Sequence, residues 1–346
     1  IRDRLKANGG IIKLSAATAK NLSRSSVNIG YSGLIIARSV NDKTGKVVIG
    51  SPTNEKIKIA GKIDVSGHRS LTPSGTIIVR GRSVTHNGKI FARGGTGGKV
   101  NIISKDTLKL DGSIFAQGTK EKGGSVLFLS EKSISSTPKT VVDVSGANKG
   151  GRIRSLAKTT NISSGTFKSN SEGGKGGNID LTADRVEISN ANIEAAGNLM
   201  GGKVRIGGDY LGGQDLTIMD NKNVYGFVSR FGDQPSIQNS KQTIVKADTN
   251  IDVSSEKGQG GTAVVWSDQM TDFEGKINAR GAEIVALTTV VNADKSTYKS
   301  SKEPPILTIK NKLEPIESTV DPPPKKVIQL SLSLIHISEP TRPIHI

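Results

Sequence analysis

The sequence contains no cysteine and few aromatic residues. None of the 346 residues is cysteine, and only 3% are phenylalanine, tyrosine or tryptophan. The lack of cysteine excludes disulfide bonds and suits a chain that crosses an oxidising compartment unfolded. A globular domain of this length normally carries more aromatic bulk, so we expect a narrow core filled by valine, isoleucine, leucine and alanine.

Long apolar runs and a targeting segment are also missing. No run reaches the roughly 18–20 apolar residues that a membrane-spanning helix needs. No signal peptide is recognisable, and the chain begins at Ile1 instead of methionine. We therefore expect a fragment whose targeting segment, if it has one, lies upstream.

Acidic residues are outnumbered by basic ones. The 48 lysines and arginines against 31 aspartates and glutamates give a net charge of +17, which favours anionic partners such as sulfated glycans, lipopolysaccharide, nucleic acid or acidic membranes. The basic residues are spread through the whole chain, without a basic helix or an aromatic-interleaved RNA-binding signature. A lysine-rich solvated surface is thus favoured over dedicated nucleic-acid binding.

Glycine, in contrast, is abundant and regularly placed. Doubled glycines begin at Gly97, Gly123, Gly150, Gly176 and Gly201, with spacings of 26, 27, 26 and 25 residues. A further pair begins 59 residues later, which is about two periods plus an insertion. Self-similarity at this period indicates a repeat architecture.

One repeat, residues 97–122, contains three short alternating segments. Their apolar positions are Val100 and Ile102, Leu108 and Leu110, and Ile114 and Ala116. Alternation with period two predicts three half-buried strands, which can bury their apolar face only by stacking on neighbouring repeats. The prediction is an all-β, right-handed parallel β-helix of about ten coils, with glycines at corners that need positive φ or close backbone approach.

The pattern divides the chain into four parts. Residues 1–44 are expected to form irregular first coils, and residues 45–282 the regular β-helix, interrupted by an insertion at 207–242. Residues 283–331 are rich in proline, which predicts an extended linker. Residues 332–346 resemble the translation of a common sequencing adapter and are set aside as an artefact.

The insertion is the candidate binding site. It is unusually rich in aromatic residues, and loops that project from a scaffold often carry binding. The alternative is that these rings only fix the loop against the rod. The candidate receptor contacts are Tyr210, Tyr225, Phe227, Arg230 and Phe231.

Residues with catalytic potential are sparse. His68 and His86 each lie among turn residues, without a second histidine at metal-ligand spacing. Parallel β-helices host polysaccharide lyases and hydrolases that use clustered carboxylates. Asp64, Asp143 and Asp252 occupy the same outward position of their coils, but these coils are not adjacent. The carboxylates are therefore not expected to converge, and no catalytic residue is predicted.

A calcium site is likewise not expected. Residues 173–181 partly match the Gly-Gly-x-Gly-x-Asp repeat of calcium-binding β-rolls. The aspartate is displaced, however, and the motif occurs once where a β-roll needs tandem copies. We predict no metal and no cofactor.

Three stretches resemble the filamentous-haemagglutinin family of two-partner-secreted exoproteins. Residues 201–213 read GGKVRIGGDYLGG, residues 260–268 read GGTAVVWSD, and residues 273–281 read FEGKINARG. Looser matches extend over residues 8–281. The resemblance implies a bacterial protein that is exported through an outer-membrane β-barrel partner and folds as a β-helix on the cell surface. The secretion domain that the partner recognises is not identifiable, which implies a middle segment.

Together these features predict a non-enzymatic, extracellular β-solenoid segment of a secreted adhesin. Its expected partners are the outer-membrane secretion barrel, through a missing N-terminal region, and host-surface glycans or proteins, including anionic ones. Two alternatives stay open: a secreted polysaccharide lyase or hydrolase on the same fold, and a haemolysin of the same secretion family.

Overall fold

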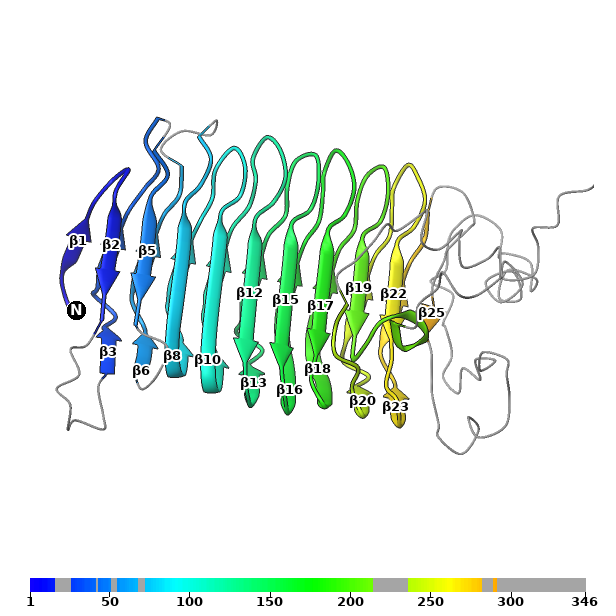
Figure 1. Ribbon diagram of the computed structural model, residues 1–346. Helices are drawn as coiled ribbons and strands as arrows, with labels where there is room; N and C mark the ends of the chain where they lie inside the picture. The colour runs from blue at the N-terminus through cyan, green and yellow to red at the C-terminus, as the bar shows by residue number, and fades with distance from the viewer. Residues whose placement is uncertain are drawn as a thin grey trace, which may run out of the picture.

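The computed structural model describes residues 1–15, 26–41, 43–50, 55–67, 72–213, 236–281 and 289–290. The chain forms an all-β parallel solenoid of about nine turns, close to the ten expected, so the predicted fold class is confirmed. Figure 1 shows the coils side by side as a rod. Among the described residues the one helix is the four-residue 3-10 helix η1 (Tyr210–Gly213). No described helix is long and apolar enough to span a bilayer.

The strands form three parallel ladders, and β8, β10, β16 and β18 each take part in two of them. The first ladder runs through β2 (Ile11–Leu14), β5 (Lys46–Ile49), β8 (Thr76–His86), β10 (Lys99–Leu110), β12 (Ser125–Ser130), β15 (Arg152–Ala157), β17 (Asn178–Thr182), β19 (Lys203–Ile206), β22 (Thr262–Val265) and β25 (Thr289–Val290). The second runs through β3 (Ser26–Ile29), β6 (Lys56–Ile59), β8, β10, β13 (Ser133–Ser136), β16 (Thr160–Lys168), β18 (Arg185–Glu194), β20 (Gln242–Val245) and β23 (Met270–Phe273). The third runs through β1 (Arg4–Lys6), β4 (Leu34–Ile36), β7 (Lys62–Asp64), β9 (Lys89–Phe91), β11 (Ser113–Phe115), β14 (Val141–Asp143), β16, β18, β21 (Asn250–Asp252) and β24 (Lys276–Asn278).

The first two predicted strands of a repeat join into one bent strand in several coils. In β10 the register with β8 shifts between Ser104 and Thr107, where the strand turns from the first ladder into the second. The third predicted strand is separate, as β11. The chain therefore turns this corner without leaving the β conformation.

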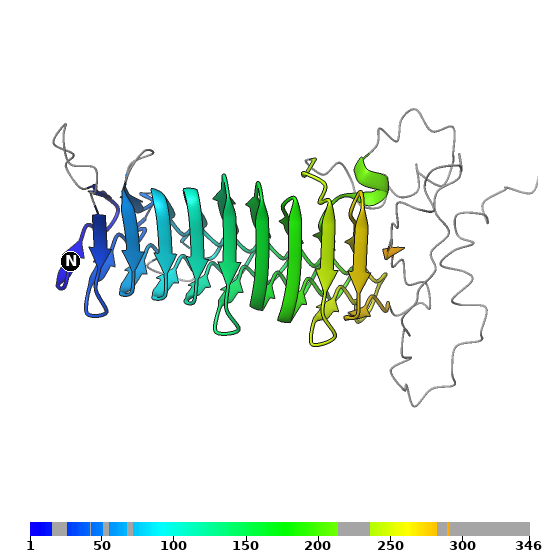
Figure 2. The same ribbon diagram turned by 90° about the horizontal axis from the view of Figure 1, so that it is seen from below.

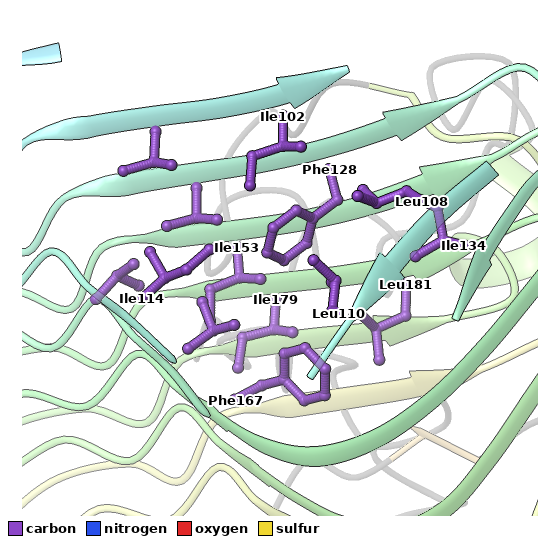
Figure 3. Packing of buried hydrophobic residues seen from close by; sticks show 14 of the residues in the cluster. Ile102, Leu108, Leu110, Ile114, Phe128, Ile134, Ile153, Phe167, Ile179 and Leu181 are labelled. Atoms are coloured by element: carbon purple, nitrogen blue, oxygen red, sulfur yellow. The ribbon is translucent and has the colours of Figure 1, made fainter. Parts of the chain in front are cut away.

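The core follows the alternation in the sequence. Inward side chains of successive coils, such as Val100, Val126 and Ile153, pair in register and are fully buried. Phe128 and Phe167 are the largest fully buried apolar side chains and fill the interior among isoleucines and leucines of several coils (Figure 3). Since each coil contributes only a few inward residues, such a core needs little aromatic bulk.

The doubled glycines form a column along one corner of the rod. A Cβ added to Gly151 would lie 2.1 Å from the carbonyl oxygen of Gly124, and one on Gly177 would lie 2.1 Å from that of Gly151. Positive φ is not the reason, because the described glycines with positive φ are others, such as Gly165 and Gly207. Close approach of stacked backbones is what requires glycine here.

The insertion joins β19 to β20. The strand β19 ends at Ile206, and β20 begins at Gln242, so the insertion lies between the first and second ladders. Its described parts, residues 207–213 and 236–240, are called the cover below. The proline-rich linker lies outside the described residues apart from β25, which pairs with β22, and residues 332–346 lie outside them entirely.

Candidate functional site

The cover lies over the outward face of the first ladder near the C-terminal end of the rod. Figure 2 shows η1 on the flank of the coils there. Outward side chains of β17, β19 and β22 that would face solvent in a bare solenoid are buried, including Asp180, Arg205 and Val264. In β12 of the same ladder the outward Leu129 is 38% exposed. We therefore take this covered face as the candidate functional site.

Trp266 anchors the cover to the rod. Its indole is 4% exposed, and its Nε1 donates a hydrogen bond to Asp268 at 2.9 Å. A Cβ on Gly208 would lie 2.7 Å from the indole Cδ1, so the ring leaves no room for a larger residue there. Asn239 Nδ2 donates to the Gly212 carbonyl at 2.9 Å and to Asp268 at 3.2 Å. The glycine-rich and Trp-Ser-Asp motifs thus form one packed unit.

A network of ion pairs lies beneath the cover. Arg205 is fully buried, and its Nε lies 2.7 Å from Asp180. Its other side meets Asp209 of the cover, and Lys203 lies 3.7 Å from the same carboxylate. Arg152 donates to the second oxygen of Asp180 at 2.9 Å. The cover therefore places a carboxylate onto a basic part of the rod.

Burial and charge act against each other in this network. Burial alone would raise the pKa of Asp180, but the hydrogen bond and charge of Arg205, followed by those of Arg152, lower it below its usual value. Burial lowers the pKa of Lys203, and Asp209 offsets part of that effect. Burial and the neighbouring Arg152 lower the pKa of Arg154, whose Nε lies 3.8 Å from Asp180, beyond hydrogen-bond distance. A buried carboxylate surrounded by arginines is strongly held in its ionised form.

The predicted receptor contacts lie mostly outside the described residues. Tyr210 begins η1, at the edge of the cover, which places its backbone beside the packed unit. Tyr225, Phe227, Arg230 and Phe231 lie outside the described residues. The role of these five residues as receptor contacts stays a prediction.

Of the two histidines singled out in the sequence, the structure describes only His86. His68 lies outside the described residues. His86 was expected in a turn, but it ends β8 and is fully buried, with its Nε2 3.4 Å from the carbonyl oxygen of Ser113. Burial lowers its pKa to about 4. The turn assignment is thus wrong for His86, because its alternating position directs the ring into the core.

The three aspartates share one position of the third ladder, as predicted. Each accepts a hydrogen bond from the backbone N–H two residues later, at 3.0 Å for Asp64, 2.9 Å for Asp143 and 2.8 Å for Asp252. Such Asx turns end the strand. Asp64 keeps the predicted outward position, where it is buried and paired with Arg38.

Two features of the third ladder were not found from the sequence. The register places Glu194 directly beside Asp252, with Glu194 3.2 Å from Lys168. Elsewhere the Phe91 and Phe115 rings stack at 5.5 Å, with the guanidinium of Arg93 4.5 Å from the second ring. Aligning the third strands of successive repeats with each other, and not at the doubled glycines, would have revealed both. Among the described residues no group of three or more histidine, cysteine, aspartate or glutamate side chains could hold a metal ion.

Comparison with known proteins shows a likeness in structure but not in sequence. No protein-family model matches the chain, and no curated protein sequence matches it. The rod is similar to the crystal structure of the HMW1 secretion domain from Haemophilus influenzae, with a TM-score of 0.53 and 19% identity. The match covers 77% of this chain and 88% of that chain. At this identity the likeness shows the fold, a β-solenoid similar to that of a secretion domain.

Proposed function

We propose that the chain is a non-enzymatic β-solenoid segment of a two-partner-secreted bacterial exoprotein, displayed outside the cell and mediating attachment to host cells or surfaces. The observation that carries the proposal is the packed unit formed by the cover and Trp266. It joins the motifs that resemble the filamentous-haemagglutinin family, on a rod similar in fold to a secretion domain.

The mechanism is mechanical and multivalent. Parallel ladders of backbone hydrogen bonds run along the rod and space the coils at roughly 4.8 Å. Outward side chains and loops are thereby held at a fixed pitch, and weak contacts to a repetitive surface add through avidity. The net charge of +17 supports anionic host-surface glycans or proteins as partners.

The proposed contact site is the insertion. It carries Tyr210, Tyr225, Phe227, Arg230 and Phe231, and its cover is fixed to the rod by Trp266. A rigid base lowers the entropy lost when such a loop binds.

Adhesion is tested with beads that carry the purified chain. We expect binding to epithelial cells, and loss of most of it when these aromatic residues are replaced by serine and the arginine by glutamine. The matched control replaces Tyr31, a 79% exposed tyrosine at the other end of the rod, by serine. Unchanged binding by the multiple variant, with an unchanged circular dichroism spectrum, would contradict the proposed contacts.

Export is tested separately: the chain is fused to a signal peptide and co-expressed with an outer-membrane secretion barrel. We expect the region that the partner recognises to lie upstream of this chain, because the resemblance identifies no secretion domain within it. Barrel-dependent release only when an upstream secretion domain is added supports that arrangement. Barrel-dependent release of the chain alone would assign recognition to these coils, and no barrel dependence in either case contradicts the two-partner class.

The proposed absence of catalysis has its own test. Glu194 and Asp252 are carboxylates on adjacent rungs, but each already has a structural role in an ion pair or an Asx turn. We expect no turnover of acidic glycans by the purified chain. Turnover that the Glu194→Gln variant abolishes would establish an enzyme instead.

A further inference from the structure

An apolar strip lies on the outward face of the first ladder, next to the cover. Ile103, Leu129 and Leu156 are consecutive partners in the register of β10, β12 and β15, and Leu127 lies beside them. Leu129 is 38% exposed, and the other three are half-buried. Outward positions of a solenoid usually carry polar residues, so four adjacent apolar side chains indicate a contact surface.

Basic side chains border the strip at both ends. Arg80 precedes Ile103 in the same column, and Arg154 and Lys158 lie near Leu156. A hollow of about 340 Å³ opens there, with walls that include Leu129, Leu156, Arg154, Lys158 and Glu131 on one side and residues 236–238 of the cover on the other. The two basic side chains of this wall outnumber its one carboxylate. A site with apolar walls and basic groups suits an acidic, apolar ligand.

The cover shows what kind of chain binds this face. One rung beyond Leu156 the column continues as Thr182, which is buried and donates a hydrogen bond to the Gln238 carbonyl oxygen of the cover. The cover also supplies the Asp209 carboxylate to Arg205. A polypeptide with an acidic side chain is therefore already bound to the next part of the same face, and the strip continues that interface.

We propose that the apolar strip binds an extended polypeptide segment of a partner protein, with apolar side chains over Leu129 and Leu156 and acidic side chains at Arg80 and at Arg154 with Lys158. Arg80 and Arg154 are three rungs apart, which is roughly 14 Å. An extended chain spans that distance with about four residues. The expected motif has two acidic residues four or five positions apart, with apolar residues between them.

Charge argues against a second copy of this chain as the occupant. The net charge of +17 and the arginines and lysine around the strip would repel another basic rod. The proposal does not depend on adhesion through the insertion, since none of the five candidate receptor contacts lines the strip or the hollow.

The test is to pan a library of random 12-residue peptides on the purified chain, and to measure the most enriched peptides by fluorescence polarisation. We expect enriched peptides with the acidic–apolar motif. The Leu129→Ser and Lys158→Gln variants should each weaken binding about tenfold, a loss of about 1.4 kcal/mol. The matched control is Ile162→Ser, at a residue with 39% exposure on another face, which should leave binding unchanged.

Several results would overturn the proposal. One is the enrichment of peptides that lack acidic residues. Another is equal peptide binding by the Leu129→Ser and Ile162→Ser variants, provided that both unfold at the same urea concentration as the wild type. Binding of phosphatidylglycerol vesicles that Leu129→Ser abolishes, without any peptide binding, would assign the strip to a lipid surface. A dimer in sedimentation that Leu129→Ser dissociates would assign it to a second copy.

Discussion

The glycine column offers a sharp test of how the coils stack. In a Gly151→Ala variant the new Cβ would lie 2.1 Å from the carbonyl oxygen of Gly124 and 2.7 Å from that of Val144. Real Cβ atoms almost never come within 3.0 Å of such atoms. Because the obstructing atoms are backbone on the preceding rung, no side-chain rotation can relieve the contact.

The loss of folding stability that we expect for Gly151→Ala is at the upper end of the range for overpacked sites. Inserting a methyl group into a packed site typically costs 1–3 kcal/mol, and here the ladder itself must open. We expect a destabilisation of about 3 kcal/mol, which at a slope of about 3 kcal/mol per molar urea lowers the midpoint by about 1 M. Hydrogen exchange should also accelerate in β12, β15 and β17, since repeats depend on their neighbours.

A Gly30→Ala variant is the matched control. The nearest atom to its Cβ would be the Ile1 carbonyl oxygen at 3.4 Å, which is ordinary contact. Alanine there lowers the entropy of the unfolded chain, so stability should stay the same or rise by up to about 1 kcal/mol. An unchanged midpoint for Gly151→Ala, or equal losses for the two variants, would refute the stacking argument.

Three further predictions concern buried polar and aromatic groups. Because burial lowers the pKa of His86 to about 4 from 6.5, only the unfolded chain binds a proton between these pH values. The contribution of His86 to stability should therefore be constant above about pH 6.5 and fall by about 3 kcal/mol towards pH 4, and His86→Leu should remove this part of the pH dependence in urea titrations. Asp180→Asn removes one of the two carboxylates paired with the buried Arg205 and should cost about 3 kcal/mol; a midpoint equal to wild type would show that the network contributes nothing. Trp266→Ala should accelerate hydrogen exchange in the cover while the circular dichroism of the rod stays unchanged, and unaltered protection of the cover would contradict its anchoring role.

Much of the fold could be predicted because successive repeats carry the same strand alternation and the same doubled glycines. Strand alternation placed Val100, Val126 and Ile153 inward, and all three are fully buried. The doubled glycines marked the corner correctly. Glycine is required there because stacked backbones approach closely, and not because the residues have positive φ. Local pattern and stacking agree in these coils, which is why a single sequence suffices.

The candidate site was less predictable because it depends on contacts between coils. Asp180 and Arg205 are 25 residues apart in the sequence but lie on adjacent rungs of the ladder. Trp266 follows the insertion in the sequence, yet it packs against Gly208, which lies at the start of the insertion. A strand pattern read one coil at a time cannot show such pairs. The same holds for the apolar strip, which becomes visible only when the outward positions of neighbouring coils are aligned.

Sequencing the native DNA on both sides of this reading frame tests the central claim most directly. The account predicts a signal peptide and a secretion domain upstream, and a neighbouring gene for an outer-membrane barrel with periplasmic docking domains. A short reading frame with its own signal peptide and no barrel gene nearby would contradict a two-partner-secreted exoprotein and favour a secreted enzyme.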